Sequence, residues 1–258
     1  MTVRLHEVVS FLDSTLEIGS FRDYGPNGLQ VEGSPEVDRI VTAVSATAEV
    51  FDRAIEMQAD LIVVHHGLIW GGGIDRVTGT TARRLSRLLS NSISLAAYHL
   101  PLDAHARLGN NVGLADAIAL QAKRSYFGEV RGHQLGLRGT WAGGISRDEA
   151  IARIGAGVNG GQVPNFVFPY GPDVVRTVGL CTGAASDLME AAATEGCDLF
   201  LTGELSERSA SLAKELQITL VAAGHYATEV FGVCRLVDEL RMKFADLQVE
   251  FVDAPTPV

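Results

Sequence analysis

The hydrophobic positions of this chain follow two different periods. Leu5, Val8, Leu12 and Leu16 recur at helical spacing, which predicts an amphipathic helix at the start. Leu61–Val64 is apolar at every position, as in a strand buried on both faces of a sheet. The same patterns predict strands at 40–45, 93–98, 218–222 and 249–252, and helices at 48–58, 81–89, 110–120, 206–216 and 228–244. Strands that alternate with helices indicate an α/β fold.

Two features depart from simple alternation. Residues 127–141 are rich in glycine and alternate polar with apolar side chains, which predicts antiparallel strands. A short helix is expected at 147–155 with Ser146 as its N-cap, and Asn110 is expected to cap the helix that it opens.

The pattern also repeats within the chain. Placing Arg39 on Thr177 brings Asp60 onto Asp198 without a gap, at an offset of 138 residues. Because two copies are too few for a solenoid, we expect two similar supersecondary units. We expect a first α/β domain at 1–126 and a second at 127–258, with the C-terminal helix and strand as candidates to pack back on the first.

Histidines and carboxylates gather where predicted strands end. His65 and His66 follow the first buried strand, and two further runs end in His99 with Asp103 and in His225 with Glu229. Open α/β sheets collect their sites at the carboxyl ends of strands, so these residues predict a metal site shared by the two halves. The candidate ligands are His65, His66, Asp103, His225 and Glu229.

The geometry of these ligands leaves alternatives. Neighbours on a regular strand point to opposite faces, so His65 and His66 share one ion only if the strand ends there; otherwise they reach two neighbouring ions. His225 and Glu229 lie on one side of a helix only if that helix begins at or before His225. Imidazoles with carboxylates suit Zn, Fe, Mn, Co or Ni better than Ca or Mg. No cysteine is placed as a ligand, which argues against a closed structural zinc site.

Other polar residues near these runs have lesser roles in this interpretation. We expect His99 to support the ligands from behind, while Glu204, at the repeat position of His66, either lines the same cavity or caps a helix. Trp70 lies beside three consecutive glycines, and a packed side chain in a solvent loop is favoured over a lid.

Charge and composition narrow the class of protein. The net charge of −10 argues against a nucleic-acid surface, although a nucleotide-sized ligand stays compatible when cations offset the charge. Arg4, Glu7 and Asp13 interrupt any signal-peptide core, and no apolar run approaches the roughly 18 residues of a membrane span. Three cysteines without a pairing pattern fit a reducing compartment. We therefore expect a cytoplasmic protein without a membrane partner.

Several motifs resemble one family, the NGG-interacting-factor-three-like proteins, also named GTP cyclohydrolase I type 2 homologues. The motifs are Asn27-Gly28-Leu29-Gln30, Asp60–Gly67, His99-Leu100-Pro101-Leu102-Asp103, Gly109-Asn110-Asn111, Thr202-Gly203-Glu204 and Gly224–Glu229. They occur in the family's order along nearly the whole chain. Leu100-Pro101 stands where the family often has Thr-Asn, but Asp103 keeps its place.

The resemblance implies more than the residues alone. It implies two similar α/β domains that face each other, with a dinuclear metal centre in the cleft between them, two divalent transition-metal ions per subunit, and assembly into a toroidal homohexamer. It also implies a metal-dependent hydrolase acting on a nucleotide or phosphoester, with GTP ring opening as the named possibility. The alternatives are a metal-handling protein, for delivery or storage, and a ring-shaped regulatory scaffold without turnover.

Overall fold

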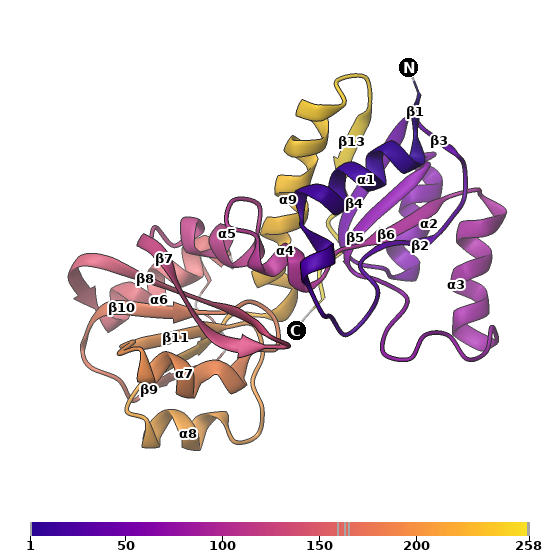
Figure 1. The fold of residues 1–258 in the computed structure, drawn as a ribbon. Coiled ribbons are helices and arrows are strands. Elements are labelled where there is room, and N and C mark those ends of the chain that lie inside the picture. The colour runs from indigo at the N-terminus through magenta and orange to yellow at the C-terminus, as the bar shows by residue number, and fades with distance from the viewer. Residues whose placement is uncertain (1, 159, 163, 165, 257–258) are drawn as a thin grey trace. The chain divides into compact units, whose positions relative to one another are not determined.

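The chain forms two compact units of mixed α/β structure. The computed structural model describes residues 2–158, 160–162, 164 and 166–256, without the side chains of 122–125. Unit 1 comprises residues 1–102 and 232–254, and unit 2 comprises residues 103–231 and 255–258. In Figure 1, unit 1 runs from indigo to purple and includes the end of the yellow helix, whereas unit 2 is mainly magenta to orange.

Unit 1 contains a five-stranded sheet in the order β13-β4-β5-β6-β2. Its strands are β2 (Gly28–Val31), β4 (Arg39–Ser45), β5 (Leu61–His66), β6 (Ser94–Ala97) and β13 (Gln248–Phe251). Four of them are parallel, and β2 pairs antiparallel with β6 at one edge. A separate two-stranded ribbon joins β1 (Val3–Arg4) to β3 (Glu36–Val37). The parallel order brings the carboxyl ends of β4, β5 and β6 to one edge.

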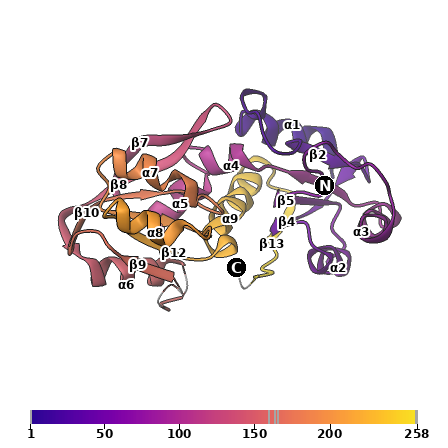
Figure 2. The same ribbon diagram turned by 90° about the horizontal axis from the view of Figure 1, so that it is seen from below.

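Helices cover both faces of this sheet. The helices are α1 (Leu5–Thr15), α2 (Ala48–Glu56) and α3 (Gly79–Ser90). Phe51 of α2 and Leu88 of α3 pack on one face, against alternate strand residues such as Ile62 and Val64. In Figure 2, α1 lies on the face opposite to α2. Burial on both faces explains why β5 is apolar along its length up to the histidines.

Unit 2 contains a six-stranded mixed sheet in the order β7-β8-β10-β11-β12-β9. Its strands are β7 (Gln121–Val130), β8 (His133–Ser146), β9 (Phe166–Pro169), β10 (Val174–Leu180), β11 (Leu199–Thr202) and β12 (Thr219–Ala222). Strands β10, β11 and β12 are parallel, while the β7–β8 hairpin and β9 add antiparallel pairs. The sheet therefore gathers the carboxyl ends of three parallel strands, as in unit 1.

The helices of unit 2 lie on two faces of its sheet. They are α5 (Asn110–Ala117), α6 (Arg147–Val158), α7 (Met189–Thr194) and α8 (Ser209–Glu215). Leu114 of α5 and Ile154 of α6 pack with the β10–β12 core on one face, and α7 and α8 lie on the other (Figure 1). Two helices run from one unit into the other, α4 (Leu100–Ala104) and α9 (His225–Lys243), and short 3-10 turns occur at Ile18–Ser20 and Ser186–Leu188.

The two units repeat the same local contacts 138 residues apart. Oδ2 of Asp60 accepts hydrogen bonds from two consecutive backbone N–H groups where β4 begins, at 2.7 and 2.9 Å. Oδ2 of Asp198 accepts the matching pair from β10, at 2.8 and 2.9 Å. The edge strand β9 also falls 138 residues after β2. Each aspartate therefore fixes the start of one strand against the turn that leads into the next.

Most of the expected elements are present, with four differences. β5 continues through His66 instead of ending before the histidines, and α9 begins at His225 instead of at residue 228. The N-cap of α5 is Gly109, so the asparagine cap predicted there is wrong. Strand β9 was not expected, because Phe166–Pro169 is too short to show a period. Ser146 does accept a hydrogen bond from Glu149 N as predicted.

The compact units divide the chain differently from the boundary expected after residue 126. Residues 103–126 belong to unit 2, because α5 packs into its core through Leu114 and Ile118. Residues 232–254 belong to unit 1, because β13 pairs with β4. As a division into two repeated domains, the expected boundary stays a prediction.

Among the described residues, no helix is both long enough and apolar enough to cross a membrane.

Candidate metal centre

Three histidines of unit 1 come together at the carboxyl ends of β5 and β6. His65 is fully buried and His66 is half-buried at the end of β5, while His99 follows β6. The ring centroids are 4.5 Å apart for His65 and His66, and 5.0 Å apart for His65 and His99. One ring nitrogen from each residue lies within 4.8 Å of the others. The adjacent histidines thus converge although the strand does not end before them.

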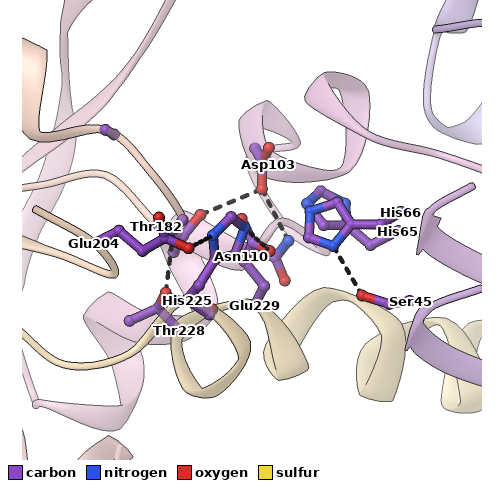
Figure 3. A network of polar contacts seen from close by, with 12 residues as sticks. Ser45, His65, His66, Asp103, Asn110, Thr182, Glu204, His225, Thr228 and Glu229 are labelled. Carbon is purple, nitrogen blue, oxygen red and sulfur yellow. Dashed lines mark hydrogen bonds and ion pairs between the residues drawn. The ribbon is translucent and has the colours of Figure 1, made fainter. Parts of the chain in front are cut away.

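Each of these imidazoles has its Nδ1 atom engaged. His65 Nδ1 lies 2.9 Å from Tyr98 O, and because a carbonyl only accepts, Nδ1 carries the proton. His99 Nδ1 donates in the same way to Asp23 Oδ1 at 2.7 Å. His66 Nδ1 lies 3.0 Å from Ser45 Oγ (Figure 3). A histidine whose Nδ1 holds the proton presents the lone pair of Nε2, which is the form that binds metals.

The Asp23 carboxylate behind His99 is buried and well satisfied. Its side chain is 2% exposed. Burial alone would raise its pKa, but the hydrogen bond and charge of His99, together with hydrogen bonds from Asn27 and from Tyr24 N, outweigh burial and lower the pKa to about 2. The group is therefore an anion at neutral pH, and it fixes His99 in one orientation.

The loop that carries Trp70 is tied to the loop that contains Gln30. Gln30 Oε1 accepts hydrogen bonds from Leu68 N and Ile69 N at 2.8 and 3.1 Å. The Trp70 indole donates to Gly67 O at 2.9 Å, and its ring stands edge-on to His99 with centroids 5.1 Å apart. Trp70 is nevertheless 38% exposed. It forms a packed wall beside the histidines, in line with the interpretation favoured from the sequence.

The site residues of unit 2 lie along the first turns of α9 and the ends of β10 and β11. Because α9 begins at His225, Glu229 follows one turn later on the same side, and His225 Nε2 is 3.0 Å from Glu229 Oε2. His225 Nδ1 donates to Glu204 Oε1 at 2.6 Å. Figure 3 shows His225 between these two carboxylates. Glu204 therefore orients a histidine and does not cap α8, which begins at Ser209.

The charge on His225 follows from these neighbours. Burial alone would lower its pKa, but the hydrogen bonds and charges of Glu229 and Glu204 outweigh burial and raise the pKa to about 9. In the metal-free protein the ring is thus a cation at neutral pH. A metal ion that binds His225 must displace this proton.

Asp103 is held by two donors in unit 2. Asn110 Nδ2 donates to Asp103 Oδ1 at 2.8 Å, and Thr182 Oγ1 donates to the same oxygen at 3.2 Å (Figure 3). Asp103 and Glu229 are 6% and 3% exposed, and a carboxylate oxygen of each lies within 4.8 Å of the other. Both anions, together with burial, raise the pKa of the Cys181 thiol. Two buried carboxylates this close create a strong demand for positive charge.

Gly183 makes room for the Glu229 carboxylate. A Cβ atom at this position would overlap Glu229 Oε1, and the backbone has a φ of +67°, which favours glycine. Gly183 N also donates to Thr228 Oγ1 at 3.1 Å, next to Glu229 in α9. The close approach of this turn explains why a residue without a side chain stands here.

The donor set fits divalent transition-metal ions. Imidazole nitrogens and carboxylate oxygens together are the ligands that Zn, Fe, Mn, Co and Ni accept, and each histidine described above has its Nδ1 held by another group. These His, Asp and Glu clusters can therefore hold metal ions.

Comparison with known proteins identifies the family. The model of the family Duf34/NIF3 (NGG1p interacting factor 3) matches residues 3–257. The chain belongs to the Duf34/NIF3 family.

Relatives within Duf34/NIF3 extend over the full length. A Pseudomonas aeruginosa protein named GTP cyclohydrolase 1 type 2 homolog is 40% identical over 258 residues, which is 100% of both chains. Among solved structures, the protein ybgI, described as of unknown function, has a TM-score of 0.90 and 36% identity, and covers 99% of this chain and 100% of its own. TTHA1606 from Thermus thermophilus has a TM-score of 0.88 and 34% identity, and covers 99% of this chain and 100% of its own.

The Duf34/NIF3 chain contains supporting residues that the sequence did not reveal. Asp23, Ser45, Asn110 and Thr182 each contact a predicted site residue. The pairing of Asn110 with Asp103, seven residues apart, could have been suspected from the Gly109-Asn110-Asn111 motif. Asp23 lies 76 residues before His99, and nothing in the sequence pattern links them.

Proposed function

We propose that this Duf34/NIF3 protein is a metal-dependent hydrolase with a dinuclear centre formed by His65, His66, Asp103, His225 and Glu229. The observation that carries the proposal is the pair of buried carboxylates, Asp103 and Glu229, with oxygens within 4.8 Å of one another. Such a pair is unfavourable unless cations compensate it. Protonated His225 supplies one charge in the metal-free protein, and metal ions would supply more.

The residues around the ligands prepare them for binding. Glu204 holds the Nδ1 proton of His225, while Asn110 and Thr182 hold one oxygen of Asp103. Ligands held in this way lose less conformational freedom when an ion binds. Two divalent ions of the Zn, Fe, Mn, Co or Ni class would lower the pKa of a bound water and stabilise negative charge on the attacked group.

The proposal includes an origin by internal duplication, with two facing α/β domains and the centre in the cleft between them. It is supported by the matched hydrogen bonds of Asp60 and Asp198 and by the equal spacing of β2 and β9. The strand registers agree as well, since Ile40 pairs with Leu61 and Val178 pairs with Leu199. Matched apolar patterns alone would be weaker support, because any two β-α-β units share them.

The substrate class rests on the relatives. The P. aeruginosa relative carries the name GTP cyclohydrolase 1 type 2 homolog, so a nucleotide is the first class to test, followed by other phosphoesters. Hydrolytic opening of the purine ring of GTP is the named reaction within that class. Metal handling without turnover is the second candidate, and a ring-shaped regulatory scaffold is the third.

Metal content is the first test of the centre. The protein is purified without added metal, and the metal per chain is measured by mass spectrometry for wild type, His66→Ala and His225→Ala. His6→Ala serves as control, because His6 is exposed on α1. We expect about two equivalents in wild type and in the control, and a loss in the other two variants. No metal in the wild type, even after soaking, would contradict the proposed centre.

Turnover is tested on metal-loaded protein with GTP, other nucleotides and simple phosphoesters. Turnover that disappears in Glu229→Ala, with the fold intact by circular dichroism, supports the hydrolase. Bound metal that exchanges readily without turnover of any of these compounds would favour the metal-handling protein instead.

The proposed assembly is a toroidal homohexamer. Light scattering would then give six times the chain mass of 27.5 kDa. A monomer or dimer at micromolar concentration would contradict this part of the proposal and leave the metal centre standing.

A further inference from the structure

His99 has the surroundings of a metal ligand although the resemblance does not include it among the ligands. Its ring lies 5.0 Å from that of His65 and 5.7 Å from that of His66, centroid to centroid. One nitrogen of each of the three rings lies within 4.8 Å of the others. Three imidazoles around one point are a common donor set for divalent transition metals. All three residues belong to unit 1.

The orientation of His99 is fixed by a buried anion. Asp23 Oδ1 accepts hydrogen bonds from His99 Nδ1 at 2.7 Å and from Tyr24 N at 2.6 Å. Asp23 Oδ2 accepts from Asn27 Nδ2 at 2.9 Å and from Leu100 N at 2.8 Å. Burying a carboxylate is costly unless it is fully hydrogen-bonded, and here four donors satisfy it. The result is a rigid support behind one imidazole, which leaves the Nε2 lone pair for an ion.

The same device occurs in unit 2 at a proposed ligand. His225 Nδ1 donates to Glu204 Oε1 at 2.6 Å, as His99 Nδ1 donates to Asp23 at 2.7 Å. Each of these histidines follows a buried parallel strand, and each precedes a carboxylate by four residues in the sequence. His99 therefore stands in unit 1 as His225 stands in unit 2.

A small pocket beside His99 and His65 gives access to this cluster. Asn27, Gln30 and Trp70 complete its wall. The alternative role for His99 is packing, since Trp70 and Tyr24 both contact its ring edge-on. Packing alone does not require a buried carboxylate on Nδ1, whereas metal ligation does benefit from one.

We propose that His99 completes a three-imidazole site for one divalent transition-metal ion in unit 1, together with His65 and His66, and that Asp23 is the carboxylate that orients it. This proposal rests on the proposed metal centre, because it shares two of its ligands. It differs from the ligand set implied by the family resemblance and from the supporting role expected for His99 from the sequence.

The test uses a background that removes the ligands of unit 2. The full-length double variant His225→Ala/Glu229→Ala is loaded with Co²⁺, and its metal content, cobalt absorption spectrum and number of imidazole ligands by X-ray absorption are measured. We expect about one ion per chain with three imidazoles. Adding His99→Ala should lower the affinity at least tenfold and reduce the imidazole count, while adding His6→Ala should change neither.

A gentler variant checks the support behind His99. Asp23→Asn keeps the size of the side chain and removes its charge, so we expect a 10- to 100-fold loss of Co²⁺ affinity in the same background. Circular dichroism and the melting temperature of each metal-free variant separate ligand loss from unfolding.

The outcomes separate this proposal from the proposed function. Unchanged affinity and imidazole count after His99→Ala would overturn the three-imidazole site and leave the dinuclear centre intact. A wild type that binds two ions beside a double variant that binds none would also overturn it. A wild type that takes up no Co²⁺ would instead refute the proposed function, and the three-imidazole site with it.

Discussion

The ends of the parallel strands differ in chemistry between the two units although the strands themselves match. Unit 1 gathers three imidazoles with a carboxylate behind one of them. Unit 2 gathers two buried carboxylates and one imidazole that carries a positive charge without metal. Unit 1 thus offers nitrogen donors with little charge, and unit 2 offers oxygen donors with net negative charge.

The difference teaches that the frame and the ligands are under separate control. The frame is set by Asp60 and Asp198, which make the same hydrogen bonds. At the strand ends the same offset pairs His66 with Glu204 and Ser45 with Gly183, where the side chains have nothing in common. Two ions bound by such unlike sets would differ in affinity and exchange rate.

The largest effect is expected at the pair Gly183 and Ser45. Gly183→Ala places a Cβ atom against Glu229 Oε1 at a φ of +67°, so we expect loss of metal from unit 2 and a destabilisation of about 1–3 kcal/mol. Ser45→Ala removes one hydrogen bond to His66 and should cost about 1 kcal/mol with metal retained. Metal content and urea unfolding of both variants measure this. Equal effects would show that the tight turn is not specific to unit 2.

The next effect should be the same in both units. Asp60→Ala and Asp198→Ala each leave two backbone N–H groups without their carboxylate acceptor, so each should cost about 2–3 kcal/mol. The free energy of unfolding, from denaturant titrations, measures this. Asp75→Ala, in an exposed loop, is the control. A cost in one unit alone would break the structural equivalence of the two aspartates.

A smaller effect depends on pH and belongs to unit 2. His225 has its pKa raised to about 9 in the folded metal-free protein, against an ordinary 6.5. The stabilisation from the charged ring is therefore fully present below pH 6.5 and is lost as the pH rises through about 9. Solvent reaches the ring, so we expect a change on the order of 1–2 kcal/mol.

Thermal unfolding of metal-free wild type and His225→Gln between pH 6 and 10 tests this. The difference in stability between the two proteins should shrink toward high pH. A constant difference would mean that the carboxylates do not hold the proton on His225. Metal uptake at pH 7.5 should also release protons, which a pH indicator records.

The smallest effect is expected at Gln30 in unit 1. Gln30→Ala removes the acceptor for Leu68 N and Ile69 N, so the loop with Trp70 should loosen at a cost of about 1 kcal/mol or less. Hydrogen exchange at these two amides should become faster, with unit 2 unaffected. Unchanged exchange would mean that the contacts of Trp70 are enough to hold the loop.

The sequence predicted the fold class because the core strands are apolar at every position and the helices are periodic. The starts of β4, β5 and α1 were predicted within one residue for this reason. Strand β9 was missed because Phe166–Pro169 is a four-residue edge strand that is partly exposed. The continuation of β5 through His65 and His66 was missed because polar residues normally mark the end of a buried strand.

The site was predicted less completely than the fold. Pairs that lie close in sequence, such as His225 and Glu229, follow from helical spacing once the helix start is known. Contacts over long separations, such as Asp23 with His99, depend on tertiary packing and leave no local pattern. The role of Glu204 was open from the sequence, and its hydrogen bond with His225 decides it.

The paired hydrogen bonds of Asp60 and Asp198 bear on where chains of this family can gain or lose residues. Each aspartate joins the end of one β-α turn to the start of the strand 21 residues earlier, so the length of that segment is fixed like the span of a bridge. A single added residue there would move the carboxylate off both amides. The exposed stretch 71–80 carries no such tie to a core strand. Length variation among relatives is therefore expected to collect in stretches of this second kind, while the bridged segments keep their count.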